Sequence, residues 1–480
     1  MKHLLVYSLL VLSCLVTAKN NDKPNIIFIF SDDQSYETIG INGQQKVITP
    51  NLDKLTKEGT TFTHAYNMGA WGPAICVSSR AMLNTGSHLW HAKNEVKRCH
   101  EGKRKTWSQL LSDAGYTTYI SGKWHVEVPA SKVFDYSKNI RKGMPQQTPK
   151  GYNRPVEGED PAKAWYPWDK KNGGYWEGGK HWSEVLADDG IAFIEQASKE
   201  KEPFFMYLAF NAPHDPRQAP KEYVEKYPLK SVALPSNYAA KYPDMGKSGV
   251  PMIRDEKLAP FPRTPYAIKV NRQEYFASIT YMDEQIGKIM QALKASGKAD
   301  NTWIIFTSDH GLAVGHHGLV GKQNMYEHSV RAPFIIKGPN IKKGGKIDSP
   351  IYLQDAMATT LEIAGVNKPS YVAYKSVFPL LKDPTHSLYD VIYGAYMGTQ
   401  RMLVKGDWKI IVYPVLKKTK LFHLKEDPME EHDLAALPAY QNKKEELLAA
   451  LELTMDKEND PMRSIAEANF SAPKKSKSKH

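Results

Sequence analysis

The sequence predicts an α/β fold with a large, doubly wound, mostly parallel sheet flanked by helices, followed by a small C-terminal antiparallel sheet with a helix. Three observations support this prediction. Continuous apolar runs end abruptly in polar clusters, helical stretches separate the runs, and short strands with turns replace this pattern after Ser376. Apolar runs without alternation are typical of strands buried on both faces. Strands that alternate with helices indicate a parallel sheet covered on both sides.

Four apolar runs are predicted as core strands: Asn25–Phe30, Tyr116–Ile120, Phe204–Phe210 and Thr302–Phe306. A polar cluster follows each run, in order Ser31-Asp32-Asp33, Ser121-Gly122-Lys123-Trp124-His125, Asn211-Ala212-Pro213-His214 and Thr307-Ser308-Asp309-His310-Gly311. Ligands bind beyond the carboxyl ends of the strands in such sheets. We therefore expect the four clusters to meet at one edge.

Helices are predicted between and after these strands. Their ranges are Pro50–Glu58, Thr106–Ala114, Arg272–Ala295 and Asp355–Ala364. The first has Thr49 as its N-cap and proline at its first position, and a glycine follows the second and the fourth.

The region after Ser376 is predicted to form the small antiparallel sheet. Its strands are Val391–Tyr393, Arg401–Val404, Trp408–Val412 and Leu421–Leu424, and a helix at Lys443–Leu453 follows. We predict a signal peptide at 1–18, a catalytic α/β domain at 19–375, a C-terminal subdomain at 376–465 and a basic, disordered tail at 466–480.

The N-terminus predicts export. Lys2 precedes an apolar run, Leu4–Val16, and Val16-Thr17-Ala18 offers small residues for cleavage. The run is short for a bilayer span, and no later segment is apolar enough to serve as one. We expect a periplasmic or secreted protein without a transmembrane segment. Anchoring as a lipoprotein through Cys14 is the alternative, because Val11-Leu12-Ser13-Cys14 loosely resembles a lipobox.

Composition and charge narrow the class of partner. Of 480 residues, 41% are hydrophobic and 24% charged, as in an ordinary globular protein, and the net charge is +12. Such a surplus suits nucleic acid, anionic lipid or an acidic polysaccharide. No zinc-finger spacing, aromatic RNA-binding strand or basic helix occurs, so we expect no nucleic-acid partner.

Cysteine is rare in the chain. Cys76 and Cys99 are the two that remain after removal of the leader. Cys76 opens a predicted helix and Arg80 follows four residues later, which puts sulfur, guanidinium and helix N-terminus together. This combination indicates an anion site with a potential nucleophile. A Cys76–Cys99 disulfide is the alternative.

Three carboxylates are expected at the edge of the sheet. Asp32, Asp33 and Asp309 would repel one another, and His310 lies beside the third. A hard divalent cation resolves the repulsion, and ligation by oxygen favours calcium or, less strongly, magnesium over zinc.

Positively charged groups are expected around this cation. They are Lys123, Lys322 and Arg80, with the imidazoles of His125 and His214. A metal with lysines and an arginine forms a cradle for a tetrahedral oxyanion such as sulfate or phosphate. Two lysines argue against a second metal ion, which favours transfer of a sulfuryl group.

These motifs in this order resemble the formylglycine-dependent (type I) sulfatases of the alkaline phosphatase superfamily, bacterial polysaccharide sulfatases among them. The resemblance covers about Lys23 to Leu434 and includes Gly321-Lys322. It implies that a formylglycine-generating maturation enzyme oxidises Cys76, and that the hydrated aldehyde attacks sulfur. One calcium ion would be held by Asp32, Asp33, Asp309, His310 and residue 76. Ser78 departs from the proline usual two residues after the modified cysteine.

The resemblance also implies roles for the surrounding residues. Arg80 would hold the diol, and Lys123 and Lys322 the sulfate oxygens. His214 would protonate the departing sugar oxygen, and His125 would take the proton that expels sulfate.

Further contacts to a sugar are expected outside the motifs. The segment Gly151–Trp182 is rich in aromatic residues, and Trp165 and Trp168 are candidates to stack on sugar rings, alongside His317. The alternative is a loop that packs its own aromatic rings, with loop histidines. The resulting hypothesis is an exported sulfatase of a sulfated, marine-type carbohydrate. A phosphoester or phosphonate hydrolase of the same superfamily and a non-catalytic binder of sulfated glycans are the alternatives.

Overall fold

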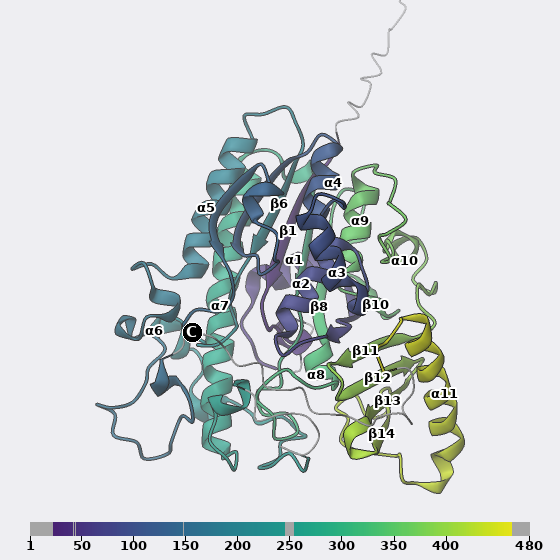
Figure 1. The fold of residues 1–480 in the computed structure, drawn as a ribbon. Helices are drawn as coiled ribbons and strands as arrows, with labels where there is room; N and C mark the ends of the chain where they lie inside the picture. The colour runs from purple at the N-terminus through teal and green to yellow at the C-terminus, as the bar shows by residue number, and fades with distance from the viewer. Residues whose placement is uncertain (1–22, 42, 44, 147, 245–253, 463–480) are drawn as a thin grey trace, which may run out of the picture.

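The structure, a computed structural model, describes residues 23–41, 43, 45–146, 148–244 and 254–462. The predicted leader and most of the predicted basic tail lie outside these residues. The chain forms a nine-stranded sheet between two layers of helices and a five-stranded sheet beside it (Figure 1). This confirms the predicted fold class.

The nine-stranded sheet has the order β10-β2-β8-β7-β1-β6-β4-β5, with β9 paired to β2. Its strands are β1 Asn25–Ser31, β2 Thr60–Tyr66, β4 Thr117–Lys123, β5 Tyr136–Arg141, β6 Phe204–Ala209, β7 Thr302–Ser308, β8 Arg331–Lys337, β9 Gly345–Ile347 and β10 Ile351–Tyr352. The four predicted core strands, β1, β4, β6 and β7, are adjacent and parallel. β8 runs antiparallel to both β7 and β2.

Two helical layers bury the faces of this sheet. Alternate residues of β1 enter opposite cores: Ile26 and Phe28 face one layer, Ile27 and Ile29 the other. The layer seen on the left of Figure 1 contains α5 Trp182–Ala197 and α7 Pro265–Ala295, with α1 Pro50–Glu58 packed on α7. The opposite layer contains α2 Ile75–Thr85, α3 Leu89–His100, α4 Trp107–Asp113 and α9 Asp355–Ile363.

The long helix begins earlier than predicted. α7 starts at Pro265 rather than Arg272, because the Thr264 hydroxyl accepts a hydrogen bond from the Ala267 amide at 3.1 Å and proline occupies the first turn. Three shorter helices are α6 Lys221–Val224, α8 Glu327–Val330 and α10 Phe378–Lys382. No helix in the described ranges is long and apolar enough to span a membrane.

The small sheet has the order β14-β13-β12-β11-β3, and α11 Gln441–Lys457 packs on it. Its strands are β3 Gly69–Ala70, β11 Ile392–Tyr396, β12 Gln400–Lys405, β13 Trp408–Tyr413 and β14 Lys418–His423. The four C-terminal strands are as predicted, but the fifth, β3, comes from the N-terminal part of the chain. Gly69 is required there, since its φ is +94° and a Cβ would lie 2.0 Å from the Ala395 carbonyl oxygen. The predicted domain boundaries stay predictions.

Candidate active site

The four polar clusters meet at the carboxyl ends of the parallel strands. In the sheet register Ser31 lies beside Ser308, so Asp32 and Asp309 leave the sheet side by side. The Asp33 amide donates to Asp309 Oδ1 at 3.2 Å across the two strands. Register alone therefore brings together residues that are 276 positions apart in the chain.

Cys76 lies in the first turn of α2 and is 4% exposed. Its sulfur lies 3.5 Å from His125 Nδ1. Both Cys76 and Cys99 are free thiols, so the alternative of a disulfide between them is not what the structure contains.

Three carboxylates and an imidazole converge beside Cys76. The ligand atoms of Asp32, Asp33, Asp309 and His310 lie within 4.8 Å of one another, and all four residues are buried. His310 Nε2 is 3.1 Å from Asp33 Oδ1 and 3.6 Å from Asp309 Oδ1. His310 Nδ1 lies 2.8 Å from the Gly311 carbonyl oxygen, an acceptor that leaves Nε2 facing the carboxylates.

The donor set fits a cation. Asp32 Oδ1 and His310 Nε2 are buried and have no hydrogen-bond partner. Burial of unpaired lone pairs is costly unless a partner is present. A ligand set made mainly of carboxylate oxygens favours calcium or magnesium. All four residues are among the predicted ligands.

Three buried cations surround the carboxylates. Arg80 Nε donates to Asp309 Oδ2 at 3.0 Å, and its Nη1 donates to the Lys123 carbonyl at 2.6 Å. Lys123 Nζ forms a short ion pair with Asp32, and Lys322 Nζ lies 2.7 Å from both oxygens of Asp33. The charges balance within the cluster, which allows three carboxylates to stay buried.

The electrostatics favour a thiolate at position 76. Burial alone would raise the pKa of the Cys76 thiol. The charge of Lys123 and the nearby imidazoles of His125 and His310 outweigh it and hold the pKa well below its usual value. The same field would stabilise negative charge on any group placed there.

His214 belongs to a second buried network. Its Nε2 is 3.0 Å from Lys322 Nζ, and its Nδ1 is 3.0 Å from Asp215 Oδ1. Burial lowers the pKa of His214, but the nearby Asp33 and Asp215 carboxylates raise it above its usual value overall. Arg254 closes the network with a bidentate pair to Asp215 at 2.6 and 3.1 Å and a contact to Asp255 at 2.5 Å.

These groups surround a cavity of about 270 Å³ that we call the Cys76 cavity. The residues lining it are Pro73, Ala74, Cys76, Lys123, His125, Met144, His214, Arg254, Asp255, Lys322 and Gln323. Sequence reasoning missed Met144, Asp215, Arg254, Asp255 and Gln323. Asp215 could have been predicted as a site residue from its place next to His214. Arg254 and Asp255 lie in no motif, so no local pattern indicates them.

The backbone is held in sparsely populated conformations at this site. Asp33 and His125 have positive φ values of 68° and 54°. Such values are uncommon for residues other than glycine and cluster at functional sites. Gly122, with φ +91°, precedes Lys123, and a Cβ there would lie 2.0 Å from the Ala209 carbonyl oxygen.

The small sheet supports one wall of the Cys76 cavity. The Gln400 side chain in β12 donates to the Gln323 carbonyl at 3.0 Å, and the Tyr396 hydroxyl in β11 donates to the Pro73 carbonyl at 3.5 Å. Both acceptors lie close in sequence to residues of the site, so the small sheet positions the segments that carry Cys76 and Lys322.

Three residues predicted to bind substrate lie outside this cavity. Trp165 is 6% exposed, and the Arg154 guanidinium lies 4.0 Å above its ring. Trp168 stacks on Tyr166 with ring centroids 4.8 Å apart. His317 stacks on Tyr326 at 4.0 Å. The aromatic segment packs against its own neighbours because each ring has a partner there, and substrate contact stays a prediction for all three.

Two family models match the chain. The model described as Sulfatase matches residues 24–366, and the one described as N-sulphoglucosamine sulphohydrolase, C-terminal, matches residues 315–457. Together they span both sheets.

Similar proteins include the N-acetylglucosamine-6-O-sulfatase of Bacteroides thetaiotaomicron, 28% identical over 94% of this chain and 90% of that protein. The ulvan-active sulfatase of Formosa agariphila is 28% identical over 79% of this chain and 70% of its own.

Solved structures share the fold. One, in complex with its substrate D-glucosamine-2-N,6-O-disulfate, has a TM-score of 0.70 and 23% identity, covering 92% of this chain and 99% of that one. The phosphonate monoester hydrolase of Agrobacterium radiobacter has a TM-score of 0.69 and 19% identity, covering 91% and 96%.

Proposed function

The chain belongs to the sulfatase family, whose members are sulfuric ester hydrolases, and on this premise we propose that it removes sulfate esters from a sulfated carbohydrate, with residue 76 as the nucleophile. The observation that supports this most directly is the arrangement of Lys123, Lys322 and Arg80 around Cys76 and the carboxylates. A sulfate monoester carries a single negative charge on a tetrahedral group, which suits a small, cation-lined cavity.

Cys76 as a thiol is a poor catalyst for hydrolysis, and its conversion to formylglycine would supply a hydrated aldehyde with a hydroxyl nucleophile. Position 76 suits that chemistry for three reasons. It is at the start of a helix, where negative charge is stabilised. His125 lies 3.5 Å away and can accept a proton. Lys123 lowers the pKa of the group at this position.

Calcium, with magnesium as the less favoured choice, would be held by Asp32, Asp33, Asp309, His310 and residue 76. It would supply Lewis-acid stabilisation of negative charge. In its neighbourhood Arg80 fixes Asp309, and the ion pairs of Lys123 and Lys322 leave both ammonium groups at the cavity wall.

His214 is proposed as the acid that protonates the departing sugar oxygen. It lines the cavity, and the carboxylates of Asp33 and Asp215 raise its pKa above the usual value, which favours the protonated form. Asp215 accepts from Nδ1 and thereby points Nε2 toward Lys322 and the cavity.

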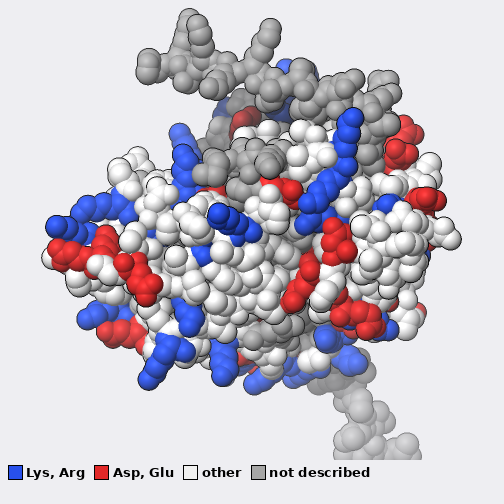
Figure 2. All heavy atoms as spheres, turned by 90° about the horizontal axis from the view of Figure 1, so that it is seen from below, with Lys and Arg blue, Asp and Glu red and all other residues white. Residues whose placement is uncertain are grey.

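We also propose that the protein is exported to the periplasm or beyond and acts on a polysaccharide or an oligosaccharide derived from one. The leader sequence and the net charge of +12 support this. The positive charge is not gathered in one patch on the face drawn in Figure 2, where acidic and basic side chains are interspersed.

Co-expression with a maturation enzyme tests the proposal. Peptide mass spectrometry over residue 76 reports conversion, and release of inorganic sulfate is measured on sulfated oligosaccharides of carrageenan, ulvan, fucoidan and glycosaminoglycans. We expect conversion and sulfate release from at least one of them. Faster hydrolysis of 4-nitrophenyl phosphate than of 4-nitrophenyl sulfate would indicate a phosphoester hydrolase. Full conversion with binding and no release from any substrate would indicate a binding protein.

A further inference from the structure

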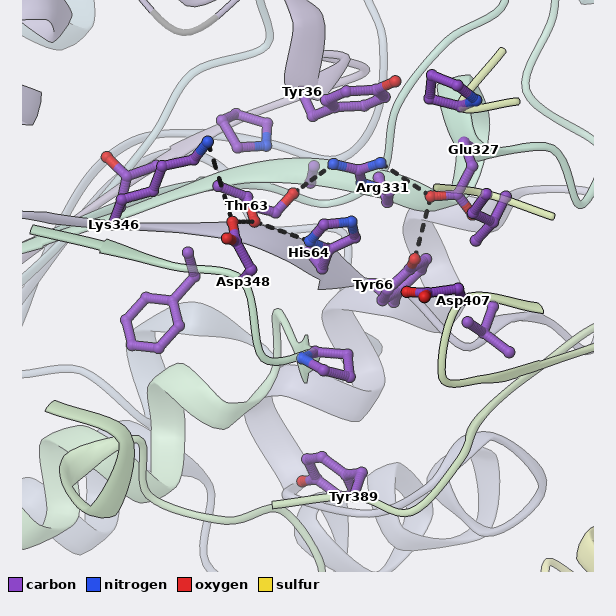
Figure 3. Close-up of a pocket in the computed structure, with 18 of the residues that line it drawn as sticks. Tyr36, Thr63, His64, Tyr66, Glu327, Arg331, Lys346, Asp348, Tyr389 and Asp407 are labelled. Atoms are coloured by element: carbon purple, nitrogen blue, oxygen red, sulfur yellow. Dashed lines mark hydrogen bonds and ion pairs between the residues drawn. The ribbon is translucent and has the colours of Figure 1, made fainter. Parts of the chain in front are cut away.

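A second and larger cavity lies where the two sheets meet. This wide cavity has a volume of about 750 Å³ and shares no lining residue with the Cys76 cavity. One wall is formed by β2 and the start of β8, and the other by residues 387–391, the β12–β13 turn and residues 424–428. Figure 3 shows its polar side chains converging from these elements.

A β-bulge shapes the wall formed by β2. The register of β2 against β8 shifts between Phe62 and Ala65, which leaves Thr63 and His64 out of the regular ladder. The Arg331 guanidinium donates to the Thr63 carbonyl at 2.5 Å and holds the bulge in place. Bulges re-aim side chains and are frequent beside functional sites. Here the bulge places Thr63 and His64 in the lining of the cavity.

A chain of hydrogen bonds fixes the tautomer of His64. The Thr63 hydroxyl donates its proton to Asp348 Oδ1 at 2.7 Å. The Thr63 hydroxyl oxygen therefore acts as the acceptor toward His64 Nδ1, also at 2.7 Å. His64 then carries its proton on Nδ1 and leaves a lone pair on Nε2. In the part of the chain that the structure describes, Nε2 has no hydrogen-bond partner. Burial and the charge of Arg331 lower the pKa of His64 to about 4, so the ring is neutral at pH 7.

Carboxylates and cations both line this cavity. Arg331 is paired with Glu327 at 3.0 Å. The other charged groups in the lining are three carboxylates, Asp348, Asp390 and Asp407, and two lysines, Lys346 and Lys425. Asp390 and Asp407 have no ion-pair partner among the described residues. The small excess of carboxylates disfavours an anionic sulfate, whereas hydroxyl groups would find free acceptors.

The lining also offers surfaces for the apolar face of a ring. Tyr389 contributes an aromatic ring, and three prolines, Pro333, Pro350 and Pro428, contribute rigid apolar edges. The ring of Tyr36 also lines the cavity, but the Arg331 guanidinium lies 3.8 Å from its centroid. Polar acceptors with a few aromatic platforms are the chemistry that an uncharged sugar requires.

We propose that the wide cavity is a second carbohydrate site, which binds an uncharged, hydroxyl-rich stretch of glycan that carries no sulfate. This proposal goes beyond the proposed function, because binding in the wide cavity requires neither formylglycine nor turnover. The cavity lies near the Cys76 cavity along the chain: Tyr36 follows Asp33, and Glu327 follows Lys322, by a few residues. A polymer with sulfated and unsulfated stretches offers a ligand to each of the two cavities.

The full-length Cys76→Ala variant, loaded with calcium, tests this without turnover. Saturation-transfer NMR and calorimetry would be run with two neutral probes, neoagarohexaose and N-acetylchitohexaose, and with a sulfated carrageenan hexasaccharide. We expect a neutral probe to bind. His64→Leu in the same background should weaken that binding about tenfold or more through loss of the Nε2 acceptor, and Asp407→Asn by a smaller factor. The matched control is His100→Leu, an exposed histidine outside the cavity, which should change nothing.

Two results would overturn the proposal: no binding of either neutral probe, or neutral binding that His64→Leu and Asp407→Asn leave unchanged. Stronger binding of the sulfated probe that depends on His64 would identify an anion site instead. Asp407 is exposed, so its variant keeps the test decisive if His64→Leu fails to fold. A failed sulfatase reaction leaves these results intact.

Discussion

The Cys76 cavity and the wide cavity are neighbours along the chain and opposites in chemistry. The smaller one is lined by Lys123, Lys322 and Arg254, with a single carboxylate, Asp255, in its lining. The larger one presents a neutral histidine and carboxylates such as Asp390 and Asp407, with Lys346 and Lys425 also in its lining. The smaller cavity is built for a compact anion, and the larger one for a ligand that donates hydrogen bonds.

The difference shows how one fold can separate two kinds of recognition. Short segments run from the carboxylate cluster to the wide cavity, yet the buried arginines and lysine at each end pair locally. Arg80 and Lys123 pair with carboxylates of the cluster, and Arg331 pairs with Glu327. Because these cations belong to separate networks, changes in one cavity should leave ligand binding in the other intact.

The largest effect is expected from Cys76→Ala. The variant should lose at least about 10⁴-fold in turnover, because the nucleophile is removed, while its fold and neutral-sugar binding persist. Sulfate release measures turnover, and circular dichroism measures whether the fold persists. Cys99→Ala is the matched control and should retain activity. Residual turnover of Cys76→Ala near the wild-type value would refute the role of residue 76.

His214→Ala should lower turnover by about 10²- to 10⁴-fold for a sugar sulfate. The loss should be much smaller for 4-nitrophenyl sulfate, whose leaving group needs no proton. Comparison of kcat/KM for the two substrates checks the prediction, and His100→Ala serves as the control. An equal loss for both substrates would contradict the assignment as an acid.

Lys322→Ala should lower kcat/KM by roughly 10²-fold, because the anionic transition state loses one hydrogen-bond donor. The carboxylate of Asp33 also loses its partner at 2.7 Å, so calcium should partly compensate. Inhibition by inorganic sulfate measures binding, with Lys298→Ala as the control. A near-normal kcat/KM together with unchanged sulfate inhibition would exclude Lys322 from the site.

The smallest effect is expected from Glu430→Gln, in the network that joins the small sheet to α8. Lys409 Nζ lies 2.8 Å from Glu327 and 2.9 Å from Glu430. Burial, together with the charge of Glu327, raises the pKa of Glu430 from 4.5 to about 7. The folded state thus resists ionisation of Glu430, and wild-type stability should fall as the pH rises from about 4.5 to about 7.

Glu430→Gln should remove this part of the pH dependence. Between pH 5 and pH 8 its Tm should fall less than that of the wild type, by about 2 °C. Differential scanning calorimetry of both proteins, with the exposed Glu452→Gln as control, gives the comparison. Parallel Tm curves for wild type and Glu430→Gln would show that Glu430 stays ionised across this range.

The sequence predicted the parts of the site that follow core strands. Apolar runs with abrupt polar ends located Asp32, Lys123, His214 and Asp309, since local patterning determines both the strand and the point where it ends. Other parts depend on contacts that no local pattern encodes. Arg254 joins the site through Asp215 and Asp255, and β3 joins the small sheet through two residues, Gly69–Ala70.

Two strands of the fold were missed for a physical reason, and sugar contact by the aromatic segment stays a prediction. β2 and β8 were missed because the Thr-rich β2, TTFTHAY, has no continuous apolar run, and Arg331 and Pro333 interrupt the start of β8. The aromatic segment looked suited to stacking on sugars, but burial of Trp165 under Arg154 satisfies the ring within the protein. Composition shows that rings are present, and only the packed structure shows which ones are free.

The burial of Cys76 imposes an order of events on maturation. Its side chain is 4% exposed, α2 encloses it, and the preceding residues are joined to the small sheet through β3. A maturation enzyme would reach this sulfur poorly once both sheets have assembled. The proposed conversion to formylglycine would therefore have to precede folding, while the segment around position 76 is still extended, and a molecule that folded first would keep its thiol.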